Sequence, residues 1–168
     1  MSKTTSNSQI PLSSLVDWSR QHITAVFQAP SNELTLLALD SAFSRSLQAT
    51  VNGEPVDFEG FAKMIGAMAE ETAATGPHVD WVFAEATESD DSGRNGVVKG
   101  EYYIRGICGR IPGSDGRLLE IECRKAVVGR IESQSSDLGI DSRRIVTLDA
   151  TVSITPVDSH GRGVDTKE

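Results

Sequence analysis

The sequence has no long hydrophobic run, and this excludes a membrane-spanning helix. The longest apolar stretch, Leu34 to Leu39, includes Thr35 and is far shorter than the roughly 18 residues that a span needs. The N-terminal residues MSKTTSNSQI also lack the apolar segment of a secretory signal. We therefore expect a cytoplasmic protein that does not partner with a membrane.

Positive charge, cysteine and histidine are also scarce. Sixteen Lys and Arg stand against 24 Asp and Glu, which gives a net charge of −8 and argues against nucleic acid as a partner. The two cysteines, Cys108 and Cys123, are expected to be buried free thiols in a reducing compartment. The three histidines, His22, His78 and His160, match no close ligand spacing, so we predict no metal. Phosphate-loop and nucleophile-elbow motifs are also missing, and no cofactor is predicted.

What is present suits one folded domain. A chain of 168 residues with 38% hydrophobic residues is long enough to bury a core but too short for a multidomain enzyme. Both ends are polar, so we divide the chain into a flexible tail at 1–11, a domain at 12–156 and a second flexible tail at 157–168.

The first half of the domain has the periodicity of helices. Apolar residues recur every three or four positions from about Ser13 until shortly before Pro30. A second helix is expected from a cap at Ser31 or Asn32 to about Phe43, with Leu34, Leu37 and Leu39 as its apolar surface. After a short strand at 46–51 and an Asn52-Gly53 turn, a third and longest helix is predicted from Asp57 to the breaker pair Gly76-Pro77.

In the second half of the domain, the repeat of apolar residues changes from about 3.6 positions to 2, which indicates strands. Four long runs, separated by turn-rich segments, predict an antiparallel meander: His78 to Glu88, Val97 to Ile111, Arg117 to Glu132 and Arg143 to Thr155. Strands of this length imply a strongly curved sheet. Glycines within the runs are expected at bulges or bends: Gly100, Gly106, Gly109 and Gly129.

This order of elements resembles the nuclear transport factor two-like superfamily, also called cystatin-like or SnoaL-like cone folds. The resemblance covers about 12–156 and is strengthened by three stretches that look like fungal members: HITAVFQAP, VNGEPVDFEGFAKMI and DSRRIVTLDATVSI. It implies an α+β fold in which three N-terminal helices pack on a strongly curved antiparallel sheet, a cone-shaped α+β barrel with an apolar pocket. Members range from isomerases, cyclases and dehydratases to non-catalytic association domains, so the fold does not choose the function.

The alternation of side chains along each strand indicates which residues face the helices. In the third run, the alternate positions that are mostly apolar include one charged residue, Lys125. In the first run, the corresponding set includes Glu85 beside Trp81 and Phe83. In the last run we place Val146 and Leu148 inward and Ile145 outward. The second run leaves open whether Tyr102 or its neighbour Tyr103 faces inward.

These residues make a hypothesis for an active site. Glu85 acts as the general base or acid and Lys125 stabilises an enolate-like oxygen of an apolar carbonyl substrate, as in an isomerase, cyclase or dehydratase of secondary metabolism. The residues expected to line the ligand pocket are Trp18, His22, Trp81, Phe83, Tyr102, Val146 and Leu148. The alternative interpretation is that Glu85 and Lys125 pair with each other or extend toward solvent and perform no chemistry.

Two further features bear on function. His78 and Asp80 lie two apart, and resemblance to scytalone dehydratase-like members suggests an acid–base pair, but the parity of the strand places both on the rim or outer face. Ala126, Val128, Ile145, Thr147 and Thr151 are expected to form a flat outer surface for a homodimer. The competing hypothesis to an apolar-ligand protein is a non-catalytic module for homodimerisation or protein association.

Overall fold

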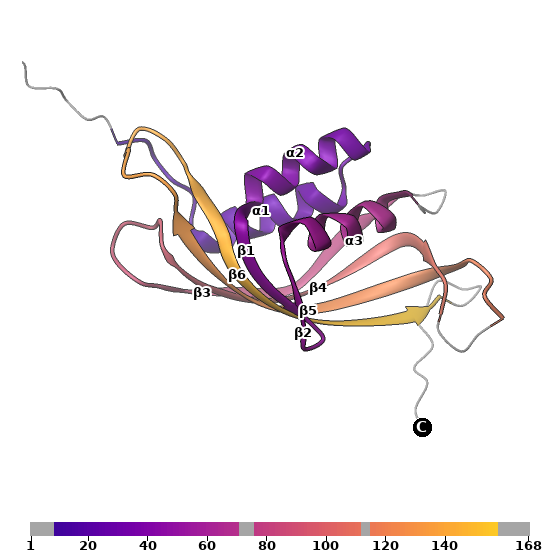
Figure 1. The fold of residues 1–168 in the computed structure, drawn as a ribbon. Coiled ribbons are helices and arrows are strands. Elements are labelled where there is room, and N and C mark those ends of the chain that lie inside the picture. Colours follow the sequence, from indigo (N-terminus) through magenta and orange to yellow (C-terminus); the bar gives the residue numbers. More distant parts are fainter. Residues whose placement is uncertain (1–8, 71–75, 112–114, 158–168) are drawn as a thin grey trace, which may run out of the picture.

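A computed structural model of the chain describes residues 9–70, 76–111 and 115–157 (Figure 1). The first half of the chain forms two helices, two strands and a third helix. In order they are α1 (Leu15–Phe27), α2 (Asn32–Ala42), β1 (Phe43–Val51), β2 (Glu54–Val56) and α3 (Phe58–Glu70). Four long strands follow: β3 (His78–Glu88), β4 (Gly96–Gly109), β5 (Leu119–Ser133) and β6 (Arg143–Pro156). The helices lie together against one face of the curved sheet, which confirms the predicted α+β class.

The helix starts follow from their capping residues. The Ser14 hydroxyl accepts a hydrogen bond from the backbone of Asp17, and the Ser31 hydroxyl accepts one from Leu34 at the start of α2. The carboxylate of Asp57 accepts the amide of Gly60 at the start of α3. The predicted continuation of this helix to Gly76 falls partly on 71–75, outside the described residues.

The predicted apolar surface of α2 is wrong for two of its three leucines. Leu39 is fully buried, but Leu34 and Leu37 are 46% and 57% exposed. The buried positions of α2 are instead Thr35, Leu39 and Ala42, because α1 and the sheet contact a different stripe of the helix.

The six strands form one sheet in the order β2-β1-β6-β5-β4-β3. Neighbouring strands are antiparallel except β1 and β6, which run parallel, so the sheet is mixed and not wholly antiparallel as predicted. The Asn52-Gly53 turn is confirmed, since both residues have positive φ, and it leads into the short strand β2, which the sequence pattern did not predict.

Three β-bulges exchange the faces of the long strands. The extra residue is Val82 in β3 and Val146 in β6, while β4 carries Arg105 and Gly106 opposite the single residue Glu122 of β5. Gly106 has φ +74°, and a Cβ atom there would lie 1.9 Å from the carbonyl oxygen of Gly76. Glycine is therefore required at this bulge, whereas the other two occur at valines.

The core lies between the helices and the concave face of the sheet. Its fully buried members include Leu15 and Trp18 of α1, Leu39 of α2, and Ile104 and Ile131 of the sheet. No helix among the described residues is long and apolar enough to cross a bilayer. At the N-terminal side, the amide of Ile10 donates to the carbonyl of Leu138, in the connection between β5 and β6.

Candidate functional site

Lys125 lies in the middle of the sheet on its concave, helix-facing side. The alternation along β5 buries Cys123, Lys125 and Val127 and exposes the residues between them, as the sequence pattern predicts. Lys125 is 6% exposed and stands between Tyr102 of β4 and Val152 of β6 in the register of the sheet. A lysine at this depth is unusual, because lysine side chains are rarely buried without a partner.

The surroundings of Lys125 are aromatic and apolar. Its ammonium nitrogen lies 4.3 Å from the centre of the Phe27 ring, which α1 places above the sheet. Tyr102, 3% exposed, packs between Phe27 and Trp81, with ring centres 6.0 and 4.6 Å away. Tyr102 is thus the inward tyrosine of the second run.

Burial shifts the pKa of each ionisable group in this cluster. It lowers the pKa of Lys125, although the nearby Cys123 thiol acts in the opposite direction. It raises the pKa of the Tyr102 hydroxyl and of the Cys123 thiol. All three shifts favour the neutral form of the group over its charged form.

None of the carboxylates among the described residues forms an ion pair with Lys125. Glu101 of the neighbouring strand β4 points to the outer face and pairs with Arg124, and Glu122 of β5 itself pairs there with Arg105. On the inner face, the described residues beside Lys125 include Tyr102, Cys123, Val127 and Val152, and the Phe27 ring lies near its amine. Within the described part of the chain, the amine therefore has no carboxylate to pair with.

The helical cover ends close to Lys125. On the same face of β6, Val152 is half-buried and Ile154 is 47% exposed. Figure 1 shows that the C-terminal end of β6 and the adjoining ends of β4 and β5 extend past the C-terminal end of α3. We call Lys125, Val152 and Ile154 the inner-face ledge, since they lead from the buried amine to an exposed apolar surface.

The core itself is nearly filled. A void of about 10 Å³ is lined by Ser19, Trp81 and Leu148, among other residues, and another void of about 10 Å³ lies beneath α3. Such a volume is too small for an organic ligand, and the Ser19 hydroxyl at its edge has no hydrogen-bond partner among the described residues. Larger hollows are on the surface, about 880 Å³ between β1, β2 and α3, and about 710 Å³ between α1 and α2.

Glu85 does not join Lys125, and its predicted inward orientation is wrong. The bulge at Val82 shifts the following residues by one, so that Phe83 lies opposite Glu101 and Glu85 opposite Lys99, on the outer face. Glu85 is exposed, and Phe83 is only partly buried. The structure thus places the two expected catalytic side chains on opposite faces of the sheet, and it removes Phe83 from the inner face as well.

Among the other predicted pocket residues, Trp81, Tyr102 and Leu148 face inward. The indole nitrogen of Trp81 donates to the Thr24 hydroxyl of α1 at 3.1 Å, which fixes the orientation of the ring against that helix. Val146 is the extra residue of the β6 bulge and is half-buried.

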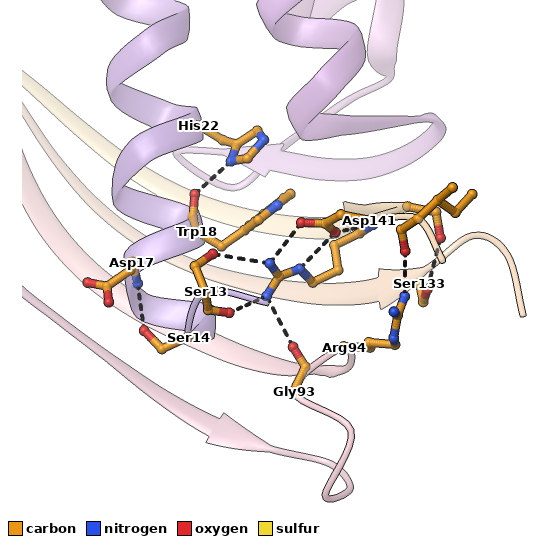
Figure 2. A network of polar contacts seen from close by, with 12 residues as sticks. Ser13, Ser14, Asp17, Trp18, His22, Gly93, Arg94, Ser133 and Asp141 are labelled. Carbon is orange, nitrogen blue, oxygen red and sulfur yellow. Dashed lines mark hydrogen bonds and ion pairs between the residues drawn. The ribbon is translucent and has the colours of Figure 1, made fainter. Parts of the chain in front are cut away.

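Trp18 and His22 belong to a separate polar network (Figure 2). The His22 ring stacks on Trp18 at 4.3 Å, and its Nδ1 donates to the Trp18 carbonyl at 2.9 Å. Burial lowers the pKa of His22. The guanidinium of Arg143, 0% exposed, lies 5.5 Å from the centre of the Trp18 ring and donates to Asp141 and to the carbonyls of Ser13 and Gly93.

This network joins the start of α1 to the two hairpins beside it. It explains why Arg143 is fully buried, a feature that the strand parity did not indicate, since the bulge at Val146 brings Arg143 and Ile145 to the inner face. The prediction that Ile145 faces outward is therefore wrong, and Ile145 is 3% exposed.

On the outer face, His78 and Asp80 are both about half exposed and their side chains lie 3.4 Å apart. Asp80 also pairs with Arg105. The pair therefore stands on the convex surface, as the strand parity indicates, and away from Lys125.

Comparisons with known proteins concern the fold. No family model matches the sequence, and neither does any curated protein. Hexachlorocyclohexane dehydrochlorinase LinA-type3 from Novosphingobium barchaimii LL02 has a TM-score of 0.56 at 10% identity, over 85% of this chain and 90% of that one. An uncharacterised protein with a cystatin-like fold from Caulobacter vibrioides has a TM-score of 0.56 at 11% identity, over 82% and 87%. Mtr2 from Candida albicans has a TM-score of 0.54 at 16% identity, over 84% and 96%.

Proposed function

Because this chain has the cystatin-like fold, which nuclear transport factor two-like proteins share, we propose that it binds a small, mostly apolar molecule on the inner-face ledge. In this proposal the Lys125 amine recognises a carbonyl or carboxylate oxygen of the ligand. The observation that carries it is a lysine that is 6% exposed and has no acidic partner among the described residues.

The physical argument concerns the cost of leaving Lys125 unpaired. A buried polar group without a partner costs about 1–3 kcal/mol, and the ring of Phe27 offsets only part of this cost. A ligand oxygen at the amine would relieve the remainder, while Val152 and Ile154 would bury its apolar part. Glu85 has no role at this site, so the proposal is for binding and does not include proton transfer by a carboxylate.

Native mass spectrometry of protein purified gently from its own source tests this proposal. The wild type should carry a stoichiometric small molecule, which denaturing extraction releases for identification. Lys125→Met should lower its occupancy, and Lys99→Met, on the exposed outer face, should not. Wild-type protein without cargo, or equal occupancy in the Lys125 variant, would contradict the proposal.

A second candidate function is a protein-association module. It is favoured by three exposed leucines on α2, Leu34, Leu36 and Leu37, and by the nearly filled core. In the same native spectra, this function would give an empty chain in complex with another protein.

For self-association we propose a homodimer through the outer sheet face. Val128 is 44% exposed there, and Ala126 of the same strand and its register partner Thr151 are exposed on the same face. Val128→Glu should shift the sedimentation coefficient from that of a dimer to that of a monomer. A wild-type protein that sediments as a monomer at all concentrations would exclude this interface.

A further inference from the structure

We infer that Lys125 forms a reversible imine with the aldehyde or ketone group of an apolar molecule. This inference rests on the proposed function, because it names the class of ligand that the inner-face ledge would hold. It also assigns the lysine a covalent role, which simple recognition of an oxygen does not require.

The first argument is the protonation state of the amine. Imine formation needs a neutral amine with a free electron pair, and lysines on a protein surface are almost entirely protonated near pH 7. Lys63 and Lys99 are both exposed on the surface. Lys125 differs from them in its burial against the Phe27 ring and in having no ion pair with an acid of the described chain, and burial also lowers its pKa.

The second argument is the identity of the surrounding groups. The described groups beside Lys125 include apolar side chains, Phe27 from α1 and Val152 from β6, and two groups whose pKa is shifted toward the neutral form, Tyr102 from β4 and Cys123 from β5. A positively charged ligand would find no counter-ion at this place. A carbonyl compound is uncharged, so it enters an apolar environment at low cost and reacts there with the amine.

The reaction balances without any further reagent. The Lys125 nitrogen uses its electron pair to form a bond to the carbonyl carbon. The two protons of the neutral amine leave with the carbonyl oxygen as one water molecule, and a neutral C=N bond remains. Nothing is oxidised or reduced, and hydrolysis by water reverses the step.

The location of Lys125 also suits reversible release. The amine stands at the inner end of the ledge, opposite Val152. Ile154, two residues further along β6, is 47% exposed. An apolar carbonyl compound lying along β6 would therefore bring its carbonyl group to the amine while its other end remains near solvent.

Reductive trapping tests the inference with benzaldehyde as the probe. The wild-type protein is incubated with benzaldehyde and sodium cyanoborohydride at pH 7, which converts an imine to a stable secondary amine, and the modified lysines are quantified by peptide mass spectrometry. A lower pKa raises the fraction of neutral amine at pH 7. We expect Lys125 to be modified several-fold faster than Lys63 and Lys99 in the same sample.

The surface lysines serve as internal controls, so the test does not depend on a variant that folds. Lys125→Arg keeps a cation but cannot form an imine, and it should lose the fast modification while Lys63 and Lys99 are modified as before. Modification of Lys125 at or below the rate of the two surface lysines would overturn the inference.

Benzoate separates failure of the inference from failure of the proposed function. Benzoate has the same ring but cannot form an imine, and its binding is followed by chemical-shift changes at Val152 and Ile154. If benzoate binds and benzaldehyde is not trapped, the imine is excluded but the binding site remains. If benzoate does not bind and benzaldehyde is not trapped, both proposals fail.

Discussion

Replacing Lys125 by methionine should make the protein more stable. Burial of the unpaired amine costs about 1–3 kcal/mol. The contact of the Lys125 ammonium with the Phe27 ring stabilises the wild type by about 0.5–2 kcal/mol, and the variant loses this contact. A methionine sulfur on the same ring would replace about 0.3–1.5 kcal/mol of that stabilisation. We therefore expect the free energy of unfolding to rise by about 1–2 kcal/mol and, for a domain of this size, Tm to rise by about 2–8 °C.

The effect should depend on pH in a defined direction. Because burial lowers the pKa of Lys125 from 10.5, the unfolded chain binds more protons than the folded protein between the folded pKa and 10.5. The free energy of unfolding of the wild type therefore increases as pH rises through that window. The difference in free energy of unfolding between Lys125→Met and the wild type is largest at neutral pH and shrinks toward pH 10.5.

Urea unfolding at pH 7 and pH 10 measures both effects. Lys99→Met is the control, and because Lys99 is exposed we expect a change within about 0.5 kcal/mol. A Lys125→Met protein that is less stable than the wild type by more than about 1 kcal/mol at both pH values would refute the reasoning, because it would mean that Lys125 has a partner that compensates for its burial.

Three further predictions concern the framework around the site. Gly106→Ala should destabilise the fold by about 3–5 kcal/mol, because it adds a backbone clash to positive φ, whereas Gly116→Ala, with positive φ and open space, should cost about 1–2 kcal/mol in the same thermal melts. The lowered pKa of His22 means that stability is lost as pH falls below 6.5, and His22→Gln should flatten the stability profile between about pH 5 and 7; an unchanged slope would contradict this. Arg143→Met should cost about 3–5 kcal/mol because it leaves buried acceptors unpaired, while the surface pair of Arg130 should contribute less than about 1 kcal/mol by urea unfolding of Arg130→Met.

The inward position of Lys125 was predictable because β5 has no bulge of its own. Its side chains alternate without interruption from Ile121 to Ile131, so one charged residue in the apolar set is visible in the sequence. That no described acid pairs with Lys125 was not predictable, because it depends on which way Glu101 of the neighbouring strand points.

Glu85 shows the opposite case. The alternation of β3 predicts it inward, but one extra residue at Val82 moves everything after it to the other face. Glycine was taken as the sign of a bulge or a bend, and among the four glycines a bulge occurs at Gly106. A valine carries no such sign, because its bulge results from the register with β4 and from the packing of Trp81 on Tyr102.

The sequence by itself determined the approximate starts of the helices, the extents of the long strands, the Asn52-Gly53 turn and the burial of Lys125. These features depend on residues close together in the chain, so periodicity and turn chemistry are enough to predict them. Only the tertiary structure decided the parallel pairing of β1 with β6, the bulges at Val82 and Val146, and the nearly filled core. Each of these depends on contacts between distant strands and helices, where one extra residue reverses the direction of every side chain that follows.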